Sequence, residues 1–200
     1  MPTKWEQESR DILKRPAPTE PPRLTSRRIG IHTSTSGGVE TAAERAYRLG
    51  CNTFQIFSSS PRMWKPYQLA KGQCGEMIRL REKYGIVPLV IHTSYLVNLA
   101  SVTEEFLNKS IQAFRGEVER ALALGAQYLV LHAGSYRGLR REEGLARAAF
   151  RSNEVFQLNQ DTLVQRSKFG RAMVDVSRCH CKLCSRQKWS RTWSKKADLL

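Results

Sequence analysis

Acidic residues are scarce in this chain, which has 18 Asp and Glu against 33 Lys and Arg and a formal net charge of +15. Such an excess favours a polyanionic partner, DNA or RNA first. Residues 1–136 hold 18 basic and 12 acidic side chains, whereas residues 137–200 hold 15 and 6. More than half of the excess therefore falls in the last third, where a solvated basic tail is the alternative interpretation.

Long apolar runs are lacking as well. The sequence has no stretch of about 18 apolar residues, so we expect no membrane span. Residues 1–20 lack the apolar segment of a secretory signal. Five cysteines, an odd number, are too few and too unevenly spaced for a disulfide framework. These absences together predict a cytoplasmic protein with reduced thiols.

Short apolar strands alternate with helical patterns in the middle of the chain. Strands are predicted at 28–32, 53–57, 87–92 and 127–132, each followed by a helix. Gly85 and Gly125 are placed to end the second and third helices. Apolar strands alternating with helices predict an α/β fold with a parallel sheet.

The flanking segments lack this rhythm. Residues 1–22 hold five of the eight prolines, which predicts a flexible leader over residues 1–27. Beyond about residue 150 no confident strand appears, so residues 151–200 are predicted to be a basic tail of uncertain structure. Since the pattern stops abruptly, we take a frame-shifted or fused tail as a hypothesis, which resequencing the locus would test.

The tail contains one cluster of potential metal ligands. Four neighbouring side chains, Cys179, His180, Cys181 and Cys184, are of the types that bind zinc. Structural zinc sites usually pair two separated knuckles, and only one is present here. Incidental cysteines are therefore the favoured interpretation, with a metal knuckle as the alternative.

Three histidines occupy equivalent places at strand ends. His32, His92 and His132 each close a predicted strand and precede small, turn-forming residues. The carboxyl ends of parallel strands lie on one side of a sheet or barrel, where active sites form. A single strand-end histidine usually satisfies a backbone carbonyl. Three in register point instead to a metal site or to substrate contact.

The segments around these histidines resemble a known family. Residues 29–64, then IHTSYLVNLAS at 91–101, then LVLHAGSYRG at 129–138, are similar to the endonuclease IV family of abasic-site DNA endonucleases. That family belongs to the xylose-isomerase-like TIM barrels. The resemblance implies the N-terminal half of a (β/α)8 barrel, with about four βα units over residues 28–150. It also implies a monomeric DNA repair enzyme that uses three zinc ions to hydrolyse the phosphodiester 5′ to an abasic site in double-stranded DNA.

The resemblance also assigns residues. His92 and His132 match the family's first two metal ligands, whereas His32 matches a histidine that is not a ligand and is expected to be structural. Arg62, Tyr95 and Leu96 match residues that enter the DNA at the lesion. The alternatives are ordinary loop packing for the Tyr-Leu pair and, for Arg62, a surface cation resting on the indole of Trp64.

The chain departs from the family beyond residue 150, where the remaining metal ligands are not found. A closed barrel takes about 200–250 residues, and two imidazoles alone would bind zinc weakly. Two other functions therefore stay open. One is a sugar isomerase or epimerase of the same fold, and the other is a non-catalytic DNA-binding remnant.

Overall fold

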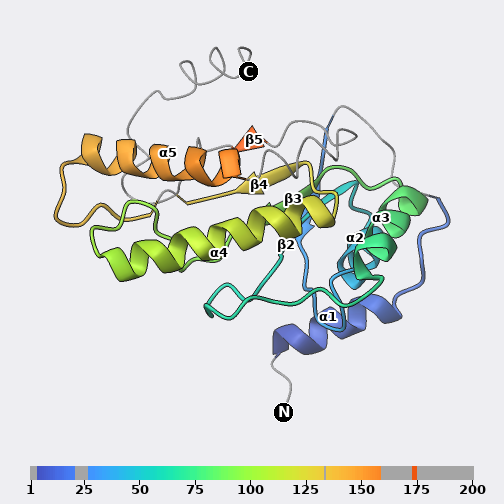
Figure 1. The fold of residues 1–200 in the computed structure, drawn as a ribbon. Helices are drawn as coiled ribbons and strands as arrows, with labels where there is room; N and C mark the ends of the chain where they lie inside the picture. The colour runs from blue at the N-terminus through green and yellow to red at the C-terminus, as the bar shows by residue number, and fades with distance from the viewer. Residues whose placement is uncertain (1–3, 21–26, 133, 159–172, 175–200) are drawn as a thin grey trace.

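The chain forms a parallel sheet whose strands follow one another in sequence order. In the computed structural model, residues 4–20, 27–132, 134–158 and 173–174 are described. Every neighbouring pair of strands is parallel (Figure 1). The strands, in their order across the sheet, are β1 (Gly30–His32), β2 (Thr53–Phe57), β3 (Leu89–His92), β4 (Tyr128–Val130) and β5 (Met173–Val174).

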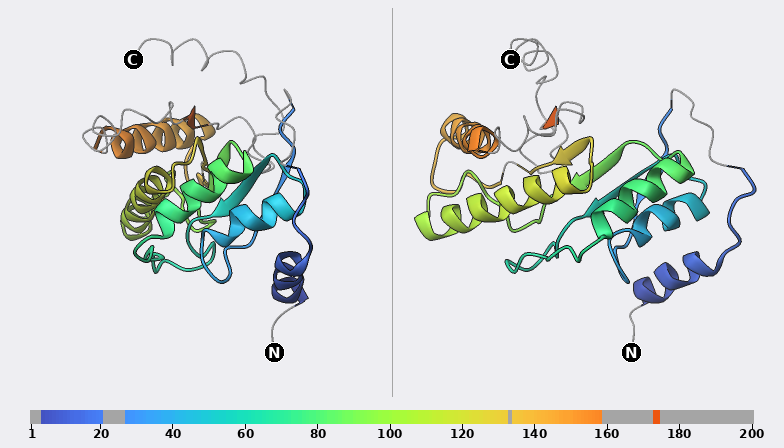
Figure 2. Two further views of the ribbon diagram at one scale, coloured as in Figure 1. Left: turned by 90° about the vertical axis from the view of Figure 1, so that its right-hand side faces the viewer. Right: turned by 45° about the vertical axis from the view of Figure 1, so that its right-hand side comes forward.

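Helices occupy the connections between these strands. Because a parallel connection must return the chain to the other end of the sheet, each of the first four strands is followed by a helix. Figure 2 shows α1 lying beside α2, and α4 as the long helix along the sheet. The helices are α1 (Lys4–Lys14), α2 (Thr41–Arg48), α3 (Gln73–Tyr84), α4 (Glu104–Ala123) and α5 (Arg141–Leu158).

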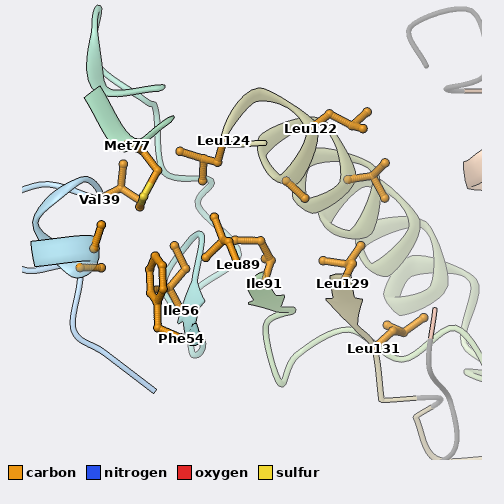
Figure 3. Close-up of a cluster of buried hydrophobic side chains, with 14 of the residues drawn as sticks. Val39, Phe54, Ile56, Met77, Leu89, Ile91, Leu122, Leu124, Leu129 and Leu131 are labelled. Atoms are coloured by element: carbon orange, nitrogen blue, oxygen red, sulfur yellow. The ribbon is translucent and has the colours of Figure 1, made fainter. Parts of the chain in front are cut away.

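The core lies between the sheet and the helices. Alternate strand residues point to this side, so that Phe54, Ile56, Leu89 and Ile91 are at most 1% exposed. Figure 3 shows these side chains beside residues from the helices and the turns next to them, including Met77. The other face of the strands carries Gln55, Val90 and Val130, which are only half-buried.

The two glycine stops predicted from the sequence are confirmed. Gly85 adopts a φ of 63° after α3, and Gly125 a φ of 66° after α4. At the second stop the amide of Ala126 donates to the Ala121 carbonyl at 2.9 Å. This bond satisfies a carbonyl in the last turn of the helix, as in a Schellman ending.

Helix α1 lies in the segment, residues 1–27, that the sequence predicted to be a flexible leader. Side chains of α2 bind this segment: Arg45 Nε donates to the Ser9 carbonyl at 2.9 Å, and the Tyr47 hydroxyl donates to the Pro18 carbonyl at 2.9 Å. These contacts join residues about 30 apart. The pattern of apolar residues within a segment does not reveal such contacts. The division into a leader, a barrel segment and a tail stays a prediction.

The region beyond residue 150 also holds more structure than the sequence predicted. Helix α5 continues to Leu158, because Val155 is fully buried and Phe156 packs edge-on against Phe114 at 5.7 Å between ring centroids. Strand β5 pairs with β4 although only two residues long, too short to show any periodicity. The cysteine cluster at 179–184 lies outside the described residues. Within the described part of the chain, no helix is long and apolar enough to cross a bilayer.

Candidate functional site

The carboxyl ends of the strands bring the three histidines to one edge of the sheet. His32 ends β1, His92 ends β3, and His132 follows β4 by two residues. The Nε2 atoms of His92 and His132 lie 3.1 Å apart, and their ring centroids 4.9 Å apart. The ring of His32 is 6.3 Å from that of His92. The convergence expected from parallel strands is therefore observed.

The imidazole of His92 has a fixed orientation. Its Nδ1 lies 2.7 Å from the Thr93 carbonyl, which can only accept a hydrogen bond, so this nitrogen carries the proton. In the neutral ring Nε2 then offers its lone pair toward His132. The side chain of His92 is only 8% exposed, which limits competition from water. A second hydrogen bond of this kind commonly orients a metal-binding histidine.

The pair fits part of a metal site. Two imidazole nitrogens on one tetrahedral zinc, each at about 2.0–2.1 Å, stand about 3.3 Å apart, close to the 3.1 Å between the two Nε2 atoms. Burial first, and then the neighbouring His92, lower the pKa of His132 and favour the neutral imidazole that a metal requires. Among the described residues, no group of three or more His, Cys, Asp or Glu side chains could hold a metal ion. The described segments thus supply two nitrogen ligands.

His32 is engaged differently. The amide Nε2 of Gln55 lies 2.9 Å from its Nδ1, and an amide nitrogen can only donate, so Nδ1 accepts. Burial, followed by the proximity of His92, lowers the pKa of His32 to about 4, so the ring is neutral at pH 7. Its remaining nitrogen then carries the hydrogen. This geometry fits the structural role predicted for His32.

Two loops at this edge are tied together at one carbonyl. Pro61 accepts hydrogen bonds from the Ser94 hydroxyl at 3.0 Å and from the Tyr95 amide at 3.2 Å. Arg62 is exposed. Because it directly follows Pro61, it lies beside the Tyr95 loop. Tyr95 is 60% exposed, whereas Leu96 is half-buried. The three residues predicted to contact DNA thus come from adjacent loops.

The ring of Tyr95 lies beside the histidine pair. Its centroid is 5.3 Å from that of His92 and 6.1 Å from that of His132. Phe57, the last residue of β2, lies beneath it at 5.3 Å and contacts His92 at 5.0 Å. Sequence reasoning did not single out Phe57, although an aromatic residue at a strand end next to a histidine was the available signal.

Asn98 connects the Tyr95 loop to the loop that follows His132. Its Oδ1 accepts from the Ser135 amide at 3.0 Å, and its Nδ2 donates to the Ser135 carbonyl at 3.1 Å. Gly134 permits this approach, because a Cβ there would stand 2.0 Å from Oδ1 of Asn98, and its φ is +94°. Asn98 was part of the motif in the sequence, but its partner lies 37 residues away and could not be identified from spacing.

An open groove of about 490 Å³ adjoins the site on the β1 and β2 side. Residues with hydroxyl groups are frequent in its lining, which also includes Arg62. Such groups donate hydrogen bonds to anionic oxygens. The groove is lined by residues 32–35, Val39, 57–62 and Tyr67.

Known proteins match this chain over the same region. The family model described as "Xylose isomerase-like TIM barrel" matches residues 43–165. "Probable endonuclease 4" from Solibacter usitatus is 57% identical over 119 residues, which cover 60% of this chain and 41% of that protein. The chain spans about half the length of the curated relatives that it matches.

Solved structures agree. An endonuclease IV from Thermus thermophilus superposes with a TM-score of 0.58 at 39% identity, covering 66% of this chain and 47% of that one. A D-psicose 3-epimerase superposes with a TM-score of 0.51 at 16% identity, covering 68% and 49%, and this likeness concerns the fold alone. The resemblance and the partial (β/α)8 barrel identified from the sequence are confirmed. The chain belongs to the xylose isomerase-like TIM barrel family, and within it is similar to the endonuclease IV proteins.

Proposed function

We propose that this chain acts in DNA repair as a zinc-dependent endonuclease that hydrolyses the phosphodiester 5′ to abasic sites in double-stranded DNA. One observation carries the proposal: the ring of Tyr95 lies 5.3 Å from that of His92. A residue suited to entering damaged DNA therefore lies beside two candidate metal ligands. The 57% identity to a protein named "Probable endonuclease 4" supports the same activity.

His92 and His132 would hold the metal through the Nε2 atoms that face each other at 3.1 Å. Bound zinc would supply an activated water and neutralise charge on the phosphate and on the leaving oxygen. The protein's own contribution is to fix the ligands: the Thr93 carbonyl orients the ring of His92, and burial keeps His132 neutral. Any further ligands lie outside the described residues of this chain.

Arg62, Tyr95 and Leu96 would engage the DNA. Apolar and aromatic side chains inserted between base steps unstack and kink a duplex. The distortion costs least where a base is already missing. The exposed ring of Tyr95 and the half-buried Leu96 have this character, and the net charge of +15 favours the phosphate backbone.

Incision of a synthetic duplex tests the activity. The full chain is incubated with zinc and a duplex carrying one abasic site, and with the same duplex without the lesion. We expect a single cut on the 5′ side of the lesion, no cut in the intact duplex, and loss of cutting with a chelator or in His92→Ala. Lesion-independent cutting, or cutting that persists in His92→Ala, would contradict the proposal.

The cysteines of the tail require a control, because thiolates also bind zinc. A variant with Cys179, Cys181 and Cys184 replaced by Ser should retain the incision and the zinc bound by the two histidines. Two further outcomes separate the alternatives. Lesion-selective binding without incision would indicate the non-catalytic DNA-binding protein, and turnover of ketoses would indicate the epimerase, which only a likeness of fold supports.

A further inference from the structure

A buried ionic cluster lies on the opposite side of β2 from the histidines. Ser58 directly follows β2, and its hydroxyl donates to Oε2 of Glu117 in α4. Arg120, one turn further along α4, donates from Nε to the Ser58 hydroxyl at 3.0 Å, and its guanidinium lies 3.3 Å from the Glu117 carboxylate. The three side chains form a closed ring of contacts, which we call the Ser58 clamp.

The clamp depends on both of its charged members, because both are buried. The side chain of Glu117 is 2% exposed and that of Arg120 is 11% exposed. A charge buried this far from water is tolerated only with its partners in place, and removing one partner is strongly destabilising. The clamp therefore fixes Ser58, and with it the point where β2 ends, relative to α4.

The histidine site lies on the other side of β2 from the Ser58 clamp. Because strand residues alternate, Phe57 points away from α4, and its ring lies 4.4 Å from His32 and 5.0 Å from His92. The loop that starts at Ser58 continues to the Pro61 carbonyl, which holds the Tyr95 amide. The clamp thus lies between Phe57, which contacts the histidines, and the loop that carries Arg62.

We infer that Glu117 and Arg120 are positioning residues, which hold the loop of residues 58–62 so that Arg62 and Tyr95 meet a lesion together. The part of this inference that concerns DNA rests on the proposed function. The part that concerns the loop does not, since it follows from the contacts of Ser58, Glu117 and Arg120 alone. The alternative is that the ion pair only stabilises the packing of α4.

Hydrogen exchange of the full chain separates the positioning role of the clamp from a role in packing α4 alone. Glu117→Gln removes the charge but keeps an acceptor for the hydroxyl, and Ser58→Ala cuts the link to the loop while leaving the ion pair. In Ser58→Ala, peptides covering residues 58–68 and 93–97 should exchange about tenfold faster, as expected for losing one charge-assisted hydrogen bond in a local opening. In Glu117→Gln these peptides should exchange faster still, together with those of α4, because Arg120 is left without its buried partner. Peptides from β3 and α5 should be unchanged in Ser58→Ala. The matched control is Glu119→Gln, an exposed residue of the same helix, which should change neither.

Binding of a duplex with an abasic-site analogue supplies the second readout. Ser58→Ala should lose about tenfold of the preference for the lesion over intact duplex, with affinity for intact duplex unchanged. In Ser58→Ala, exchange that rises uniformly through α4 and the sheet, or exchange that does not change at all, would overturn the inference. A wild-type chain that shows no lesion preference would instead refute the proposed function, while the exchange result would still decide the role of the clamp.

Discussion

Replacing Asn98 by Ala should loosen the connection between the two loops that border the histidine pair. The change removes three hydrogen bonds, two with Ser135 and one from the Ala100 amide at 3.1 Å. Each is worth about 0.5–1.5 kcal/mol net. Because Asn98 is half-buried, water replaces part of the loss. We therefore expect the free energy of unfolding to fall by about 1–3 kcal/mol.

Urea denaturation, followed by far-UV circular dichroism, measures this change. The matched control is Asn108→Ala, an exposed position within α4, which should alter stability by no more than about 0.5 kcal/mol. Zinc affinity gives a second readout, since the loop after His132 loses its anchor and the affinity should decrease in Asn98→Ala alone. Equal stability and equal zinc affinity in the two variants would refute the view that Asn98 holds the site loops together.

Three further results are expected. Gly134→Ala should destabilise the chain by more than Gly37→Ala in urea denaturation: both have positive φ, but only at Gly134 does a Cβ meet Asn98 Oδ1, at 2.0 Å. Phe54→Ala should cost about 3–5 kcal/mol, since the side chain is 1% exposed, and a loss under 1 kcal/mol would contradict its place in the core. The pKa of His32 is lowered from 6.5 to about 4 in the folded chain. Between pH 4 and pH 6.5 the unfolded state therefore binds more protons than the folded state. Unfolding free energy should therefore fall as pH drops from 6.5 to 4, and less steeply in His32→Gln.

The parallel sheet and the meeting of the histidines were predictable from the sequence for a simple reason. Three of the four predicted apolar strands ended in a histidine, and parallel strands share one carboxyl edge. The distance between β3 and β4 then follows from strand spacing, so His92 and His132 had to become neighbours. The glycine stops after α3 and α4 were predictable on equally local grounds.

Contacts between distant segments were not predictable. Glu117 and Ser58 are 59 residues apart, and in the sequence Glu117 is one polar residue among several on α4. Helix α1 depends on Arg45, which lies in another helix. Strand β5 depends on the free edge of β4 and has no pattern of its own. In each case the stabilising partner is set by tertiary packing, which hydrophobic periodicity does not encode.

One site of this chain is expected to bind both a metal ion and the lesion. The most direct test measures the affinity of the full chain for a duplex with an abasic-site analogue, with and without zinc. If His92 and His132 hold zinc beneath Tyr95, zinc should tighten this binding, and the gain should vanish in His92→Ala but persist when the tail cysteines are replaced by Ser. Equal affinity with and without zinc in the wild-type chain would contradict the account.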